Sequence, residues 1–159
     1  MNTTQPTLAE KLLIKAAEDE RTLEAGGLSD SILGFHAQQA VEKLIKALLA
    51  RLNVPFELTH DLGRLQVALA STGESLPATP VPLDQLNDFA VVYRYDLLFQ
   101  FASPDLAELR ETVRMIREHV VARIAALSAT PYRLRYNSWK RLPRRGLDSL
   151  GRRARRSIC

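Results

Sequence analysis

Apolar residues recur at three- and four-residue intervals over most of the first 127 positions, which is the period of an α-helix with one buried face. The longest such pattern lies in residues 29–53. Its apolar positions are Leu33, Ala37, Ala40, Val41, Leu44, Ile45, Leu48, Leu49 and Leu52. The opposite side carries Gln38, Glu42 and Lys46, with Glu42 and Lys46 in the favourable i,i+4 charge order. The pattern predicts the central helix of a bundle.

A first helix is predicted over residues 7–24. Thr7 and Glu10 have the spacing of a capping box, in which hydroxyl and carboxylate each accept a hydrogen bond from an otherwise unpaired backbone N–H. Its apolar stripe turns inward, and the charged residues 18–21 are expected to face water. Two glycines at 26–27 end the helix, because glycine readily adopts the left-handed conformation common at helix ends.

The remaining helices follow from similar signals. Ser29 or Asp30 is expected to cap the central helix, and Thr59 or Asp61 the next one. We expect further helices over residues 61–71, from residue 83 through Tyr93–Asp96, and from a Ser103 cap to Leu127, with Pro104 at the first helical position and a loop at 72–82. No stretch alternates like a strand. The fold class is therefore predicted to be all-α, an antiparallel up-and-down bundle of about five helices with the second and fifth at its centre.

Charge divides the chain into two parts. Residues 1–127 contain 12 basic and 17 acidic residues, whereas residues 128–159 contain 10 basic residues and one acidic residue, Asp148. We therefore expect a helical domain at 1–127 and a basic, arginine-rich, flexible tail at 128–159. Three roles for the tail stay open: nucleic-acid binding with Trp139 as a stacking face, contact with an acidic partner, or no selected role.

Composition excludes a few kinds of site and location but does not indicate a particular function. The one cysteine, Cys159, has no partner for an intramolecular disulfide or a cysteine-based metal site. The first twenty residues lack the features of a secretory signal, and no uncharged apolar run is long enough to span a bilayer. We therefore expect a cytoplasmic protein that does not enter the membrane, with no metal and no cofactor.

Three short stretches carry a family resemblance. They are FHAQQAVEK with KALL at residues 35–43 and 46–49, THDL at residues 59–62, and YRYD at residues 93–96. In this order and spacing they resemble the HEPN domain family of small helical bundles, over about Thr7 to Leu127. The basic tail has no counterpart in the family pattern.

The resemblance implies a homodimer and a minimal nucleotidyltransferase as partner. It also implies a metal-independent RNase, in many members, whose active site is an Arg followed four to six residues later by a His, with two copies meeting at the dimer cleft. This chain has Arg94, but no histidine follows until His119. An arginine cannot replace the missing proton acceptor, because its pKa is too high. The usual RNase machinery is therefore incomplete.

Arg94, Tyr95 and Asp96 are nevertheless the candidate catalytic or phosphate-binding residues. Arg94 would hold a phosphate and Tyr95 would stack or donate a hydrogen bond. The competing interpretation is a surface arrangement of Arg94 and Asp96 beside a buried Tyr93.

The candidate nucleotide- or RNA-binding residues on the central helix are His36, Gln39 and Lys43, which share one helical face. A polar contact between helices is the favoured interpretation of His36, because a lone histidine is weak evidence for a site. His60 is expected to fix the loop before the third helix, and His119 to be an exposed helical residue.

The leading hypothesis is a HEPN component of a toxin–antitoxin or nucleotide-linked stress system. It would bind nucleotide or RNA and a nucleotidyltransferase partner. One rival is an active RNase in which Tyr95, Asp96 or His36 of a second copy replaces the missing histidine. The other rival is a protein-interaction module without a nucleotide site. The charged face of the last helix, from Glu108 to Glu118, is expected to be solvated.

Overall fold

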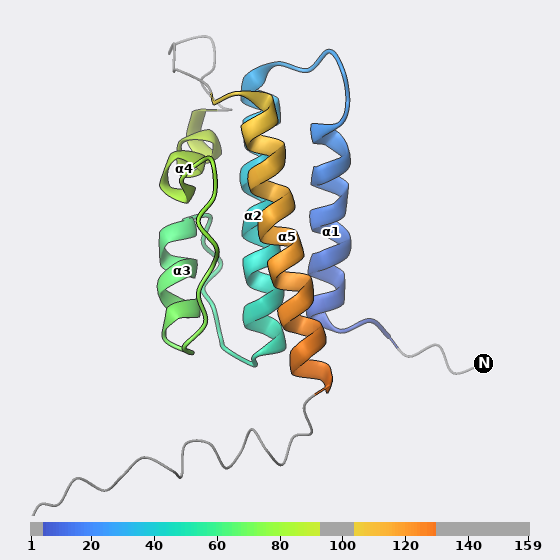
Figure 1. Cartoon of the computed structure of the whole chain (residues 1–159), viewed down its shortest axis with the longest axis vertical. Helices are drawn as coiled ribbons and strands as arrows, with labels where there is room; N and C mark the ends of the chain where they lie inside the picture. The colour runs from blue at the N-terminus through green and yellow to red at the C-terminus, as the bar shows by residue number, and fades with distance from the viewer. Residues whose placement is uncertain (1–4, 93–103, 130–159) are drawn as a thin grey trace, which may run out of the picture. The chain divides into compact units, whose positions relative to one another are not determined.

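The computed structural model describes residues 5–92 and 104–129, and within these ranges it contains five α-helices and no strand (Figure 1). The helices are α1 (Leu8–Leu23), α2 (Asp30–Arg51), α3 (Leu62–Ala70), α4 (Leu83–Val92) and α5 (Leu106–Ala129). The predicted all-α helical bundle is confirmed. None of the described helices is long and apolar enough to cross a membrane.

The start of α1 follows the predicted capping box. The Thr7 hydroxyl accepts from the backbone N–H of Glu10 at 3.3 Å, and the Glu10 carboxylate accepts from the backbone N–H of Thr7 at 2.6 Å. Both groups would otherwise be unpaired at the helix start, so the cap sets where α1 begins. The helix ends at Leu23, and Gly27 follows with a φ of 80°, the left-handed conformation that glycine adopts without strain.

The central element is α2, against which α1, α3 and α4 pack. Fourteen of its 22 residues are buried, including Leu44, Ile45, Leu48 and Leu49. Each fully buried leucine or isoleucine contributes about 1.5–3 kcal/mol relative to an exposed one, so this helix holds much of the core energy. It ends at Arg51, and Asn53 then turns the chain with a φ of 57°, a conformation that asparagine tolerates better than most residues.

The last helix, α5, runs along α2 with one apolar stripe buried, rather than sharing the centre with it as predicted (Figure 1). The buried stripe contains Leu109, Val113, Ile116, Val120 and Leu127, as predicted. Within the described ranges, α5 therefore has far fewer buried residues than α2.

The predicted caps of α2 and α5 have different outcomes. Ser29 occupies the N-cap position of α2 but makes no cap hydrogen bond, because its hydroxyl pairs with that of Ser31 at 2.9 Å. The last helix begins at Leu106, and its first backbone bond runs from Leu109 to the carbonyl of Asp105. Ser103, the predicted cap of this helix, lies outside the described residues.

The third and fourth helices agree with the pattern. Asp61 caps α3 by accepting from the backbone N–H of Gly63 at 2.9 Å. In α4, Leu86 and Phe89 are buried as expected. Tyr93 and the predicted tail lie outside the described residues, and the domain boundary at residue 127 stays a prediction.

The close approach of α2 and α4 at Gly34 generates a stability prediction. A Cβ on Gly34 would overlap the ring of Phe89. In an open helix alanine is about 0.5–1 kcal/mol more favourable than glycine, but here we expect Gly34→Ala to lower the free energy of unfolding by about 1–3 kcal/mol through overpacking. Urea denaturation measures this change. Gly26→Ala, where no atom lies within 4 Å, is the control. Equal stability of Gly34→Ala and wild type would contradict the close contact.

Candidate functional site

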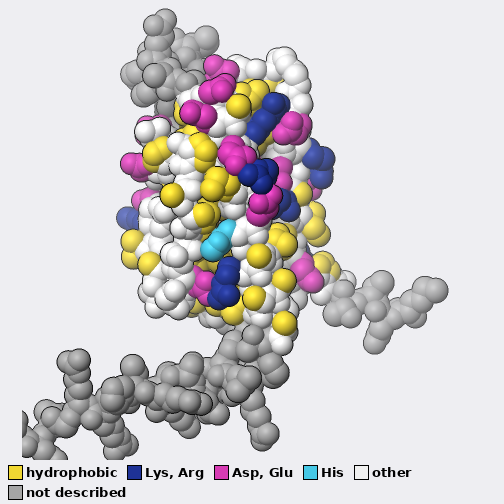
Figure 2. All heavy atoms as spheres, viewed as in Figure 1, with side chains coloured by type: hydrophobic (Ala, Val, Ile, Leu, Met, Phe, Trp, Pro, Cys, Tyr) yellow, Lys and Arg dark blue, Asp and Glu magenta, His cyan; other side chains and the backbone are white. Residues whose placement is uncertain are grey.

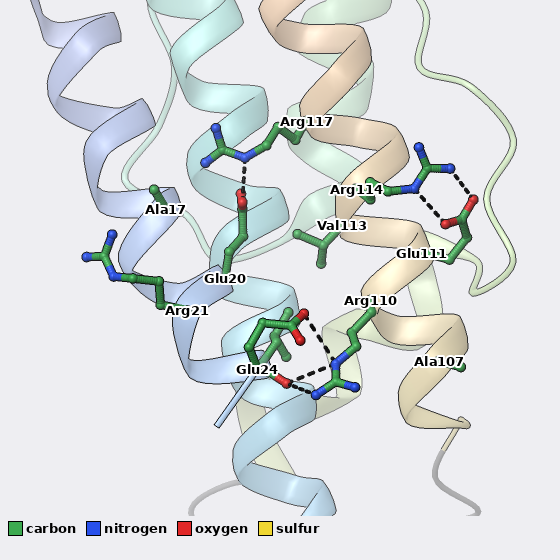
Figure 3. Close-up of a pocket in the computed structure, with 11 residues that line it drawn as sticks. Ala17, Glu20, Arg21, Glu24, Ala107, Arg110, Glu111, Val113, Arg114 and Arg117 are labelled. Carbon is green, nitrogen blue, oxygen red and sulfur yellow. Dashed lines mark hydrogen bonds and ion pairs between the residues drawn. The ribbon is translucent and has the colours of Figure 1, made fainter. Parts of the chain in front are cut away.

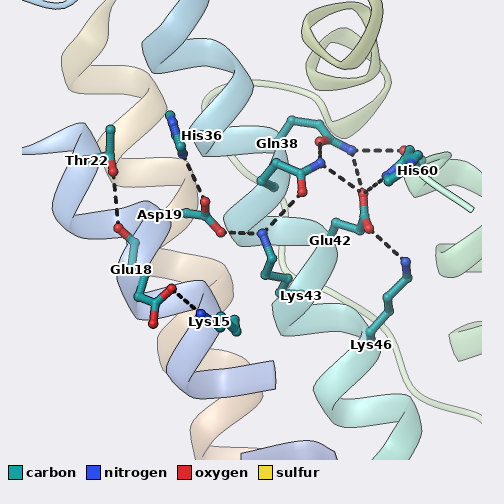
Figure 4. Close-up of polar contacts among 11 residues, drawn as sticks. Lys15, Glu18, Asp19, Thr22, His36, Gln38, Glu42, Lys43, Lys46 and His60 are labelled. Carbon is teal, nitrogen blue, oxygen red and sulfur yellow. Dashed lines mark hydrogen bonds and ion pairs between the residues drawn. The ribbon is translucent and has the colours of Figure 1, made fainter. Parts of the chain in front are cut away.

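The carboxylate of Asp19 in α1 contacts polar side chains of α2 (Figure 4). Asp19 contacts the Nδ1 of His36 at 2.9 Å with one oxygen and accepts from the Nζ of Lys43 at 2.5 Å with the other. Lys43 also donates to the Oε1 of Gln39 at 3.2 Å. Asp19 is buried, so the prediction that it faces water is wrong. The favoured interpretation of His36, a polar contact between helices, agrees with this geometry.

A second cluster surrounds a carboxylate on another side of α2. Glu42 accepts from the Nζ of Lys46 at 2.7 Å and from the Nε2 of Gln38 at 3.1 Å, and lies 3.0 Å from the Nδ1 of His60. Gln38, Glu42 and Lys46 are 0%, 4% and 7% exposed. The side of α2 predicted to lie opposite the apolar face is therefore buried as well.

The reason for this burial is the chain segment that leads into α3. Gln38 donates to the backbone carbonyl of His60 at 2.9 Å, and Lys46 donates to that of Thr59 at 2.8 Å. Buried carbonyls outside regular structure need donors, and side chains of α2 supply them here. His60 thus helps to hold the loop before α3, which agrees with the role expected for it.

Gln39 joins the two clusters. Its Nε2 donates to the Oε1 of Gln38 at 2.7 Å and lies 3.4 Å from the Oε2 of Glu42. The result is one continuous hydrogen-bonded chain across α2, which we call the polar strip. It consists of Asp19, His36, Gln38, Gln39, Glu42, Lys43, Lys46 and His60 (Figure 4).

The polar strip carries no excess charge while its imidazoles are neutral, because Asp19 and Glu42 balance Lys43 and Lys46. Burial opposes ionisation of Glu42, but the hydrogen bonds from Lys46 and His60 outweigh it and hold the pKa of Glu42 below its usual value. Glu42 is therefore an anion at neutral pH. The strip is suited to directional hydrogen bonding more than to attraction by net charge.

Parts of the polar strip reach the surface. The side chain of His60 is 71% exposed, and those of His36 and Lys43 are 28% and 23% exposed. The predicted binding residues His36, Gln39 and Lys43 therefore come together at a partly accessible place. Among the described residues, no group of three or more His, Cys, Asp or Glu side chains is arranged to hold a metal ion.

The candidate catalytic residues Arg94, Tyr95 and Asp96 lie outside the described residues, so their geometry is not part of this site. His119 is not the exposed residue that was predicted. Its Nε2 is buried and, within the described ranges, has no hydrogen-bond partner. Glu74, in the loop between α3 and α4, is close enough to His119 for that residue to affect its pKa, and it accepts from the Nε of Arg123 at 2.8 Å.

The charged face of α5 is only partly solvated. Arg110 donates through Nε and Nη2 to the carbonyl of Leu23 at 3.0 and 2.7 Å, and Arg117 donates to Glu20 of α1 at 2.5 Å. These contacts fasten α5 to α1, contrary to the prediction for this face. Figure 2 shows basic and acidic side chains interleaved along the α5 face, rather than separated into patches of one sign.

The apolar pattern of the first helix did contain a signal that Asp19 is buried, which the prediction missed. Asp19 falls in the 3-4-3-4 series of Ala9, Leu12, Ala16 and Leu23, and therefore occupies a position that faces a neighbouring helix. A charged residue in such a series indicates a buried partner of opposite charge or a hydrogen-bonding cluster.

The buried carboxylate generates a prediction with a pH dependence. Replacing Glu42 by Gln leaves Lys46 without its counter-charge, and we expect the free energy of unfolding to fall by about 3–5 kcal/mol near neutral pH, as for other buried pairs that lose one partner. Because the folded pKa of Glu42 lies below 4.5, its stabilisation is complete above that pH and is lost as the pH falls through the folded pKa. The difference between wild type and variant should therefore narrow in acid.

Urea denaturation across this pH range measures the difference. Glu57→Gln, at an exposed pair with Arg64, is the matched control and should cost about 0–1 kcal/mol. A difference between Glu42→Gln and wild type that stays constant from neutral to acid pH would show that the charge of Glu42 is not the stabilising feature.

Comparison with known proteins identifies the family of the domain. The sequence profile of the HEPN domain family matches residues 9–124, which is most of the chain and nearly the whole range over which the resemblance was seen. Comparisons with curated proteins and with solved structures found no significant match. The chain belongs to the HEPN domain family, and this membership supports a general role related to nucleotides or RNA.

Proposed function

We propose that this HEPN domain binds a nucleotide or an RNA segment as a component of a toxin–antitoxin or nucleotide-linked stress system. It acts as a homodimer together with a minimal nucleotidyltransferase. The observation that supports the binding proposal is that His36 and Lys43 meet at the Asp19 carboxylate, with Gln39 hydrogen-bonded to Lys43, at a partly exposed position.

The chemistry of these side chains fits a nucleotide better than a simple anion. Lys43 offers an ammonium group for a phosphate, and the amide of Gln39 offers both a donor and an acceptor for a base edge. Asp19 already holds Lys43 and His36, so a phosphate has to compete with a carboxylate for them. Arg94 would supply a bidentate phosphate contact.

A second candidate function is metal-independent RNA cleavage, which one feature of His60 favours. Its Nδ1 lies against the buried carboxylate of Glu42, while the ring is 71% exposed. A carboxylate at one ring nitrogen orients the imidazole and leaves the other nitrogen to act as a proton acceptor. The imidazole takes the proton of a ribose 2′-hydroxyl, the 2′ oxygen bonds to the adjacent phosphorus, and the bond to the 5′ oxygen breaks. That oxygen takes a proton from water.

Binding is tested by calorimetry with ATP, GTP and a short single-stranded RNA. We expect Arg94→Ala and Lys43→Met each to weaken binding by about tenfold or more, because each removes a charged hydrogen bond to phosphate. Lys15→Met is the matched control, since Lys15 is an exposed lysine of α1 that pairs only with Glu18 among the described residues. If neither nucleotide nor RNA binds, the domain is an interaction module instead.

Cleavage is tested with labelled RNA in the presence of EDTA. We expect His60→Gln to lower the rate by about a hundredfold or more, the usual contribution of a general base, while RNA affinity stays close to that of wild type. Arg94→Ala should lower both the rate and the affinity. Unchanged cleavage by His60→Gln would leave Tyr95, Asp96 or His36 of a second copy as the proton acceptor, and no cleavage by wild type would exclude this second function.

A further inference from the structure

A groove lies between α3 and the segment that leads into it, residues 55–61 (Figure 1). We call it the α3 groove. It has a volume of about 780 Å³, and none of the polar-strip residues lines it. Pro55 and Phe56 supply apolar surface from the segment, and Val67 and Ala68 supply it from the helix. The α3 groove is therefore a second surface, distinct from the polar strip, at which the domain can contact another molecule.

The apolar residues at the α3 groove are exposed to an unusual degree. Val67 is 73% exposed, and Leu58, which lies between two lining residues of the segment, is 98% exposed. These are the highest exposed fractions among the large hydrophobic residues that the structure describes. Phe56 and Ala68 are partly buried and pack against the core, so the fold fixes the two walls in place. Exposed apolar surface on a fixed wall is typical of the centre of a protein–protein interface.

The charged residues of the α3 groove are mainly acidic. Glu57 and Asp61 line it, and Arg64 is the one basic residue in its lining. Arg64 lies 3.0 Å from Glu57 and 3.6 Å from Asp61, so a single guanidinium is shared between two carboxylates. Arg64 is also the only lysine or arginine in residues 52–92 of the sequence. The lining therefore has an excess of one negative charge.

Exposed carboxylates of α4 extend this negative charge. Asn87 joins α4 to the first turn of α3, because it accepts from the backbone N–H of Leu62 at 2.9 Å and donates to Asp61 at 3.4 Å. Asp84 and Asp88 lie within one helical turn of Asn87, and both are exposed. Neither makes an ion pair within the described part of the chain. Together with the lining of the groove, this surface carries four carboxylates and one guanidinium, an excess of three negative charges.

The cleft between α1 and α5 has a different distribution of charge (Figure 3). Four arginines and three glutamates line it, so the two signs nearly balance. Pairs of these side chains join the two helices: Arg117 donates to Glu20 at 2.5 Å, and Arg110 lies 3.4 Å from Glu24. The charges of that cleft thus hold two helices of one chain together. At the α3 groove, by contrast, apolar surface and an excess of one sign of charge occur together.

We propose that the α3 groove binds a short segment of a partner protein that carries apolar and basic side chains. Its apolar side chains cover Phe56 and Val67, and its lysines or arginines pair with the carboxylates around the groove. Apolar contact at the centre of an interface supplies most of the affinity, and complementary charge at the rim speeds association and selects the partner. A nucleic acid does not fit this surface, because its phosphates would meet the excess of carboxylates. The inference does not depend on nucleotide binding by the polar strip.

The test is fluorescence anisotropy of the full chain with a short labelled peptide in which leucine and lysine alternate. We expect this peptide to bind, and two related peptides to bind about tenfold more weakly or worse. One has glutamate in place of lysine, and the other has serine in place of leucine. Affinity for the first peptide should fall as the salt concentration rises, because the paired charges lie at the surface. Equal binding of all three peptides, or binding of none, overturns the proposal.

Substitutions of Val67 show whether the peptide lies in the α3 groove. Val67→Lys should weaken binding by about tenfold or more, because it removes apolar surface and adds a charge that repels the peptide. Val67→Thr keeps the shape and the charge and should weaken binding several-fold. Ile14→Lys is the matched control, since Ile14 of α1 is also exposed, at 56%, and should leave the affinity close to that of wild type. Circular dichroism verifies that these surface variants keep the fold. An equal affinity of Val67→Lys and Ile14→Lys contradicts the proposal.

Two further measurements identify the occupant and separate this inference from the proposed function. Analytical ultracentrifugation should give the same oligomeric state for wild type and Val67→Lys. Dissociation of Val67→Lys alone would show that a second copy occupies the groove, and the proposal would fail. Lys43→Met, which tests the polar strip, should leave peptide binding unchanged. If RNA binding requires Lys43 while no peptide binds, the groove proposal fails and the proposed function stands.

Discussion

The buried carboxylate of Glu42 is the group on which the arrangement around α2 depends. A carboxylate removed from water is tolerated only when charges and hydrogen bonds replace its hydration. Lys46, Gln38 and His60 provide these, and the first two also hold the backbone carbonyls of the loop that precedes α3. One cluster therefore provides hydrogen bonds both to a buried side chain of the central helix and to the irregular backbone beside it.

The same cluster explains why the family motif resists a simple functional interpretation. Gln38, Glu42 and Lys46 lie within the motif, yet each is engaged in contacts that the fold itself needs. The partly exposed members of the polar strip, His36, Gln39, Lys43 and His60, are the ones that could meet a ligand.

Local signals in the sequence predicted local structure well. The capping box of Thr7 and Glu10, the Asp61 cap and the buried leucines of α3 all depend on residues within a few positions of one another. The predictions that failed concern side chains whose surroundings come from distant segments. Asp19 meets residues of α2, Arg117 meets α1, and His119 lies beside the loop before α4. A local sequence pattern does not indicate which helix or loop will pack against a given face of a helix.

Within the described ranges, the number and approximate bounds of the helices and their apolar faces could be predicted from the sequence, because periodicity and capping are properties of neighbouring residues. The family was predicted from short motifs of the same kind. The packing of the helices was needed to show that the polar side of α2 is buried and that His36 and Lys43 meet at Asp19, with Gln39 bonded to Lys43. It also decided that four arginines line a cleft between α1 and α5. The physical reason is that burial and charge pairing depend on which helix packs against which, and that packing is a property of the whole bundle.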